Sequence, residues 1–177
     1  MNKKINELFP HCATNNCLEQ HNLPVIEIYD DATLKKCIIH KEVSVTLNYP
    51  FFKIVNPNNK VVNFLAIDNC VLFECDGDKC DFAAFHDSNF YFVELKRGLG
   101  SDLNRSKKKE KAINQLKATL RLFTNNIDFR GYSLFACICV GYESPSPAAP
   151  ASDLNNLVEF INDFNTELIE GKEINLN

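Results

Sequence analysis

The chain has 177 residues, of which 45% are hydrophobic and 24% charged, and its formal net charge is −4. These values are typical of one globular domain with a real core and do not leave comfortable room for two. No apolar run approaches the roughly 20 residues that a membrane-spanning helix needs. The segment 1–10 has basic residues but no apolar stretch after them, so we expect no secretory signal and a cytoplasmic location.

The eight cysteines raise the question of disulfides. Without export, reduced thiols are the expected state. Three of them lie inside apolar runs, where a free thiol behaves as a small hydrophobic side chain: Cys37, Cys137 and Cys139. We therefore expect the cysteines to be free.

One group of residues, His11, Cys12, Cys17 and His21, offers two thiols and two imidazoles within a short span. Such a set is a candidate structural zinc site. The simpler interpretation is a helix-to-loop segment with incidental cysteines and histidines. The simpler interpretation is favoured.

The first half of the chain is rich in predicted strands. Residues 3–20 favour a short helix that is interrupted near Pro10. Runs of β-branched and aromatic residues follow over 25–55. The turn Asn-Pro-Asn-Asn at 56–59 separates them from 61–73, which is typical of a strand pair or one long bent strand.

The second half mixes strands with helices. Residues 105–124 place four apolar side chains on one helical face: Ile113, Leu116, Leu120 and Phe123. Another buried strand is predicted at 132–140, and an extended, exposed Pro/Ser/Ala segment at 143–152. An acidic helix is predicted over 152–170, with a cap at Ser152 and Asp153 and an apolar face formed by Leu154, Leu157, Val158 and Ile161.

The order strand, strand, strand, helix, strand over about 62–140 predicts an α/β fold with a mixed central sheet flanked by helices. We expect a single domain over 1–177, in which the C-terminal helix follows the Pro-rich segment. No internal repeat is visible in the sequence.

The most informative segment is 80–96, Cys-Asp-Phe-Ala-Ala-Phe-His-Asp-Ser-Asn-Phe-Tyr-Phe-Val-Glu-Leu-Lys. Its two β-rich runs, separated by a short polar break, predict a hairpin. Side chains alternate along a strand, so Glu94 and Lys96 share a face and the hairpin carries Asp81 back toward Glu94. Two carboxylates and an ammonium group at one place can hold a divalent metal and orient a water molecule.

Asp81 and the triplet Glu94-Leu95-Lys96 resemble the active site of the PD-(D/E)xK nuclease superfamily, over about residues 62–140. The resemblance implies a restriction-endonuclease-like fold and hydrolysis of phosphodiester bonds, with DNA as the favoured substrate and Mg²⁺ or Mn²⁺ as the cofactor. It implies metal binding by Asp81, Glu94 and the Leu95 carbonyl, and a role for Lys96 in positioning or deprotonating the attacking water.

The resemblance extends to Gln115, because many members carry a glutamine on the helix that follows the lysine. It implies that this amide orients the site or contacts the substrate backbone; an exposed polar helix residue is an equal alternative. One departure is Cys80, which stands where the family name expects proline. Of the other acidic residues, Asp68 in the preceding strand is the one kept as a weaker candidate ligand.

The alternative interpretation of Glu94 and Lys96 is an ion pair on the protein surface, which stabilises little. The run from Phe90 to Val93 is almost continuously apolar, which is typical of a strand buried on both faces. Ionisable groups at the end of such a strand are costly unless they are paired or functional. The catalytic interpretation is therefore favoured.

Basic residues are concentrated between positions 96 and 121, which contain nine of the 19 lysines and arginines. Only Asp102 and Glu110 oppose them there. Although the net charge is negative, a local basic stripe is what phosphate contacts require. The predicted nucleic-acid-binding residues are Arg97, Arg105, Lys107, Lys108, Lys109 and Lys111. The alternative is a solvated helix face.

Together these features predict a metal-dependent nuclease that acts in restriction, defence or repair. The alternative is a non-catalytic binding or regulatory subunit that keeps the fold. Cutting both strands of a duplex needs two active sites, so a restriction-type role would require a symmetric homodimer, with the apolar face of 152–170 and the Pro-rich segment before it as the pairing surface. A monomer would instead indicate nicking, single-strand cleavage or a subunit recruited into a complex by a protein partner. No base-recognition module is visible in the sequence.

Overall fold

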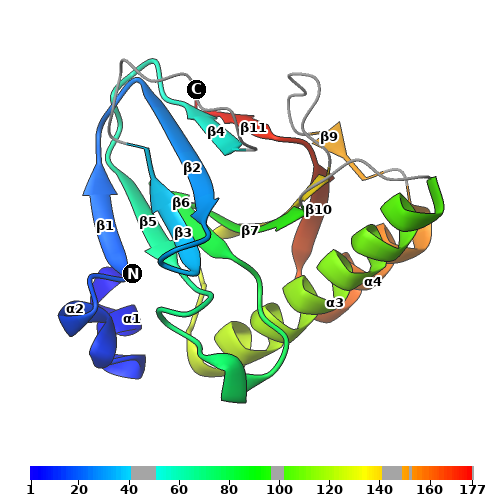
Figure 1. Cartoon of the computed structure of the whole chain (residues 1–177), viewed down its shortest axis with the longest axis horizontal. Helices are drawn as coiled ribbons and strands as arrows, with labels where there is room; N and C mark the ends of the chain where they lie inside the picture. Colours follow the sequence, from blue (N-terminus) through cyan, green and yellow to red (C-terminus); the bar gives the residue numbers. More distant parts are fainter. Residues whose placement is uncertain (41–50, 97–101, 141–148, 152, 177) are drawn as a thin grey trace.

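The computed structural model describes residues 1–40, 51–96, 102–140, 149–151 and 153–176. Within these ranges the chain forms two mixed β-sheets flanked by helices (Figure 1). No helix among the described residues is both long enough and apolar enough to cross a membrane.

The helices are α1 (Asn2–Leu8), α2 (His11–Thr14), the short 3-10 helix η1 (Glu74–Asp76), α3 (Asp102–Asn126) and α4 (Leu154–Phe164). The larger sheet contains, in spatial order, β1 (Leu18–His21), β5 (Val62–Ala66), β6 (Phe82–His86), β7 (Asn89–Lys96), β8 (Ser133–Val140), β10 (Thr166–Glu170) and β9 (Ala149–Pro150). The smaller sheet contains β11 (Glu173–Asn175), β4 (Phe51–Val55), β2 (Val25–Asp31) and β3 (Lys36–Ile39).

The larger sheet changes from antiparallel to parallel pairing at β7. Strands β1, β5, β6 and β7 pair antiparallel, whereas β8 pairs parallel with β7 and β10 pairs parallel with β8. A parallel pair requires a crossover connection. Helix α3 lies between β7 and β8 in the chain, and α4 lies between β8 and β10.

The two faces of the larger sheet are covered by different layers. On one face Phe92 of β7 contacts Phe123 of α3, with ring centroids 5.3 Å apart. On the other face Phe82 of β6 contacts Phe52 of β4, with centroids 5.7 Å apart. Phe82 is paired with Val93, so it points away from the face of Phe92. Figure 1 shows α3 and α4 side by side, with the smaller sheet on the opposite side of the larger one.

Two predicted elements that position the site are confirmed. Strands β6 and β7 form the hairpin, whose turn includes Asp87 with φ of 45°. Helix α3 begins at Asp102 and buries its predicted apolar face, which is formed by Ile113, Leu116, Leu120 and Phe123. The alternation of side chains and the helical period were sufficient to predict both elements.

The prediction of a helix over 152–170 is wrong beyond Phe164. Asn165 adopts a left-handed conformation with φ of 50°, which ends α4. The following residues form β10, in which Leu168 is fully buried. Part of the predicted exposed segment also belongs to the sheet, because β9 pairs with β10 and Ala151 is 4% exposed.

Helix α4 turns a different face to the core from the predicted one. Phe160 and Phe164 are buried, and Leu157 packs partly against the core. Three of the predicted apolar residues are exposed instead: Leu154 by 75%, Val158 by 56% and Ile161 by 54%. The predicted cap is present at Asp153, whose side chain accepts hydrogen bonds from the main-chain N–H groups of Asn155 and Asn156.

The expectation of eight free cysteines is wrong for two of them. Cys17, just before β1, forms a disulfide with Cys70, in the turn after β5. Cys17 is therefore unavailable as a thiolate ligand in the candidate zinc group, and the Nε2 atom of His11 lies 3.0 Å from the carbonyl oxygen of Val71. Six cysteines are free, of which Cys75 alone is exposed.

Candidate active site

The hairpin brings Asp81 and Glu94 together. Phe82 is paired with Val93, so Asp81, one residue before β6, lies opposite Glu94 near the end of β7. The main-chain N–H of Leu95 donates a hydrogen bond to Oδ2 of Asp81 at 2.5 Å. The main-chain carbonyl of Asp81 accepts hydrogen bonds from the N–H groups of Ile67 and Asp68, at 3.0 and 3.1 Å. Asp81 is thus held between β7 and the loop that follows β5.

Glu94 and Lys96 share the face of β7 that is covered by α3. Glu94 is 1% exposed, and the ammonium of Lys96 donates to its Oε1 atom. The same ammonium donates to Oε1 of Gln115, on α3, at 2.5 Å. The amide nitrogen of Gln115 donates in turn to the main-chain carbonyl of Lys79 at 2.8 Å. The structure therefore places together Asp81, Glu94, Lys96 and Gln115.

Both carboxylates are easier to protonate than ordinary ones. Burial raises the pKa of Asp81 to about 7, although the hydrogen bond from Leu95 and the charge of Lys96 act in the opposite direction. Burial also raises the pKa of Glu94 well above its usual range; the neighbouring charge of Asp81 adds to this effect, and Lys96 opposes it. Two carboxylates in such a place are not both ionised readily unless a cation lies between or beside them.

The site has one buried carboxylate oxygen that is open to a divalent metal ion. The Oε2 atom of Glu94 is buried and has no hydrogen-bond partner among the described residues. A buried polar atom without a partner costs free energy, and a cation that it binds removes that cost. No group of three or more His, Cys, Asp or Glu side chains among the described residues is arranged to hold a metal. A fit thus depends on the two carboxylates and on the Leu95 carbonyl that the family resemblance implies, a set of oxygen donors that suits an ion such as Mg²⁺, which keeps several waters.

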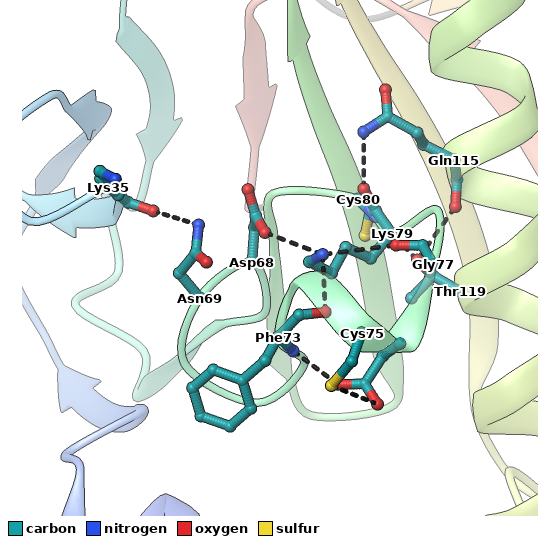
Figure 2. Close-up of polar contacts among 11 residues, drawn as sticks. Lys35, Asp68, Asn69, Phe73, Cys75, Gly77, Lys79, Cys80, Gln115 and Thr119 are labelled. Carbon is teal, nitrogen blue, oxygen red and sulfur yellow. Dashed lines mark hydrogen bonds and ion pairs between the residues drawn. The ribbon is translucent and has the colours of Figure 1, made fainter.

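Three further residues lie around this site. The side chain of Asp68 is 3.4 Å from the ammonium of Lys79, which is itself 8% exposed (Figure 2). Asp68 and Asp30 both raise the pKa of Asp81 through their negative charge. Asp30 lies on β2 of the smaller sheet, and nothing in its local sequence indicates that it approaches the hairpin. Neither Asp30 nor Lys79 was predicted from the sequence to lie near the site. For Lys79, its position two residues before Asp81 was a signal that could have indicated its proximity.

The basic residues that were predicted to bind phosphate do not all face the same way on α3. Lys107 and Lys111 are exposed, and they precede Gln115 by eight and four residues, so they lie on its side of α3. Lys108 lies on the same side of the helix, seven residues before Gln115. Lys109 is directed elsewhere, because its ammonium donates to Glu170 at the end of β10.

Two predicted phosphate contacts cannot be placed. Arg97 lies outside the described residues, and Arg105 is described only as a backbone position in the first turn of α3. The proposed binding surface therefore depends on the lysines that follow Arg105.

Comparison of the chain with known family models, curated proteins and solved structures finds no match. The family resemblance of Asp81, Glu94 and Lys96 accordingly stays a prediction from the residues themselves. The structure adds to it the convergence of these side chains with Gln115 at the end of β7.

Proposed function

We propose that the chain is a metal-dependent nuclease that hydrolyses phosphodiester bonds, with DNA as its favoured substrate. One observation carries the proposal: the buried, unpartnered Oε2 atom of Glu94 lies in a site where Asp81 stands opposite and Lys96 is fixed beside them. The chain order β5, β6, β7, α3, β8 further supports a restriction-endonuclease-like fold, since the family resemblance implies three strands, a helix and a strand.

Asp81, Glu94 and the carbonyl of Leu95 would hold the Mg²⁺ or Mn²⁺ ion. When bound, the ion would supply an activated water and stabilise the negative charge that grows on the phosphate. Lys96 has a defined place beside it, because its ammonium is held by Glu94 and Gln115 at once. The ammonium group of Lys96 can donate a hydrogen bond that orients the attacking water, or its positive charge can offset the negative charge of the phosphate.

The substrate backbone would approach along α3. Lys107 and Lys111 are exposed on the same side of the helix as Gln115, so a strand that contacts them is led toward Lys96. Lysine contacts to phosphate give affinity without base specificity. The C-terminal acidic residues lie beside α3 and pair with two other lysines of that helix, since Glu170 binds Lys109 and Glu159 binds Lys117. The proposed path therefore uses Lys107 and Lys111, where a local basic surface can bind phosphate although the net charge is −4.

The direct test is the nicking of supercoiled DNA in the presence of Mg²⁺ or Mn²⁺, with wild type and Lys96→Ala compared. We expect the variant to lose on the order of 10²-fold or more in rate. The matched control is Lys117→Ala, because Lys117 also lies on α3 and pairs with a glutamate, Glu159, at 2.6 Å. Circular dichroism checks that both variants fold. If Lys96→Ala nicks DNA at the wild-type rate, Lys96 is not a catalytic residue and the proposed site is wrong.

A second candidate is a non-catalytic binding or regulatory subunit with the same fold. One observation favours it: Lys96, Glu94 and Gln115 already bond to one another, as they would in a purely structural network. The two candidates differ in metal binding. Metal binding at a specific site stabilises the folded protein and so raises its melting temperature. The free energy of unfolding increases by about 2.7 kcal/mol when the metal is present at 100 times its Kd. No change in melting temperature with millimolar Mg²⁺ or Mn²⁺ would favour the subunit.

A further inference from the structure

The β5–β6 loop, which we define as residues 67–81, is folded around a single buried lysine (Figure 2). Lys79 is 8% exposed, and its ammonium donates hydrogen bonds to the carbonyls of Phe73 at 2.9 Å and Gly77 at 3.3 Å. It also lies 3.4 Å from Oδ1 of Asp68. The ammonium thus joins the start of the loop to its middle and its end.

A buried ammonium is costly unless its donors and its charge are satisfied. Here two carbonyls and one carboxylate meet the three N–H donors of Lys79. All three partners are acceptors, so they require a donor, and the carboxylate of Asp68 favours a donor with positive charge. A side chain of the same length without the charge would leave Asp68 without this cation and the two carbonyls without this donor.

The main chain of the same residue reaches α3. The carbonyl of Lys79 accepts a hydrogen bond from Nε2 of Gln115 at 2.8 Å, and the N–H of the next residue, Cys80, donates to Oγ1 of Thr119 at 2.8 Å. Gln115 and Thr119 are one helical turn apart and therefore neighbours on the helix surface. Figure 2 shows the loop fastened to α3 at these two adjacent points.

These contacts determine which way the Gln115 amide points. Its NH₂ group is committed to the carbonyl of Lys79, so its oxygen is left to accept from Lys96 at 2.5 Å. A series of contacts therefore runs from Lys79 through Gln115 to Lys96 and Glu94.

We propose that Lys79 is a positioning residue of the candidate site. Its side chain holds the β5–β6 loop closed, and its carbonyl thereby fixes the Gln115 amide and, through it, the ammonium of Lys96. Its effect on turnover rests on the proposed nuclease function, whereas its effect on the placement of Lys96 does not. The side chain of Lys79 contacts Asp68, the weaker candidate ligand, and the carbonyls of Phe73 and Gly77. It acts on Lys96 through the Gln115 amide.

The kinetic test uses Lys79→Met, which keeps the length and the apolar stem of the side chain but removes the charge. We expect kcat for DNA cleavage to fall roughly 10- to 100-fold, because small displacements of a catalytic group cost that much. KM for DNA should stay within about twofold of wild type, because the lysines on α3 are untouched. Lys79→Arg retains donors for the same acceptors and should restore most of kcat.

A second readout does not depend on catalysis. Acetylation of lysines, followed by mass spectrometry, measures how freely the amine of Lys96 reacts. Lys96 reacts slowly while it is held by Glu94 and Gln115, and Lys79→Met should raise its rate several-fold. Gln115→Ala should raise it as well, and the double variant should add little to either single change, because both act through one contact.

The matched control is Lys35→Met. Lys35 contacts the same loop through its main-chain carbonyl, which accepts from Nδ2 of Asn69 at 2.7 Å, and its side chain is exposed. This variant should change neither kcat nor the reactivity of Lys96. If Lys79→Met does not fold, Lys79→Gln replaces it under the same criteria.

The outcomes separate the two proposals. Wild-type protein that cuts no DNA defeats the nuclease proposal, while the acetylation rates still decide the role of Lys79. A Lys79→Met protein with wild-type kcat and wild-type Lys96 reactivity overturns the positioning role alone. So does an equal rise in the reactivity of distant lysines such as Lys53, since that means a general loosening of the fold.

Discussion

Asp81 is a residue at which the loss of hydration opposes the negative charge. Its pKa of about 7 lies above the ordinary value of 3.8, so the folded protein without metal holds a proton that the unfolded chain releases earlier. A group of this kind contributes its stability below pH 3.8 and loses it as the pH rises through 7. At pH 8 the ionised carboxylate of the half-buried Asp81 therefore destabilises the folded protein.

Because the ionised form of Asp81 destabilises the fold, we expect Asp81→Asn to stabilise the metal-free protein at pH 8, by on the order of 2 kcal/mol. Near pH 3.5, where Asp81 is protonated, the substitution should have little effect. Calorimetric melting in EDTA at the two pH values measures the difference. The control is Asp128→Asn, because hydrogen bonds from Arg130 lower the pKa of that exposed carboxylate to about 2, which gives the opposite sign. Equal melting temperatures for wild type and Asp81→Asn at pH 8 would contradict the account.

At the scale of elements, α3 joins the proposed site to the proposed substrate path. Replacing Lys107 and Lys111 together by Gln should weaken DNA binding at low salt and reduce the slope of log Kd against log salt by about 2. The control double variant is Lys53→Gln/Lys117→Gln, which removes two lysines that are paired with glutamates elsewhere. Fluorescence anisotropy over a salt series measures both slopes. If the two double variants have the same slope, Lys107 and Lys111 do not contact the DNA phosphates.

The disulfide connects the start of β1 to the turn after β5. Cys17 and Cys70 are 53 residues apart in the sequence, so the crosslink closes a large loop in the unfolded chain. We expect Cys17→Ser/Cys70→Ser to lose on the order of 3 kcal/mol of unfolding free energy. Urea denaturation under non-reducing conditions measures it, with Cys75→Ser, at the exposed free cysteine, as the control. A double variant as stable as wild type would show that the crosslink contributes nothing to stability.

Local patterns predicted the elements that carry the site and missed those that depend on distant contacts. The alternation in 82–96 was enough for the hairpin, and its register placed Asp81 opposite Glu94. The helix that ends at Phe164 was extended too far, because the sequence of β10 carries apolar residues compatible with either structure and its parallel pairing with β8 is a long-range contact. The disulfide was missed for the same reason, since no spacing predicts which cysteines meet.

At the scale of the whole molecule, the site is made by the packing of three layers. The larger sheet supplies Asp81, Glu94 and Lys96, and α3 supplies Gln115 on one face. The smaller sheet supplies Asp30, whose charge raises the pKa of Asp81. Such a contribution could not be predicted from the sequence, because it depends on how two sheets pack and on no local period.

The measurement that tests the central claim most directly is the rate at which wild type and Glu94→Gln nick supercoiled DNA as Mn²⁺ is titrated from zero. We predict a rate that saturates with Mn²⁺ for wild type, that EDTA abolishes, and that falls on the order of 10²-fold or more in the variant at every concentration. Circular dichroism confirms the fold of the variant. No cleavage by wild type with either Mn²⁺ or Mg²⁺, or full cleavage by Glu94→Gln, would contradict the account.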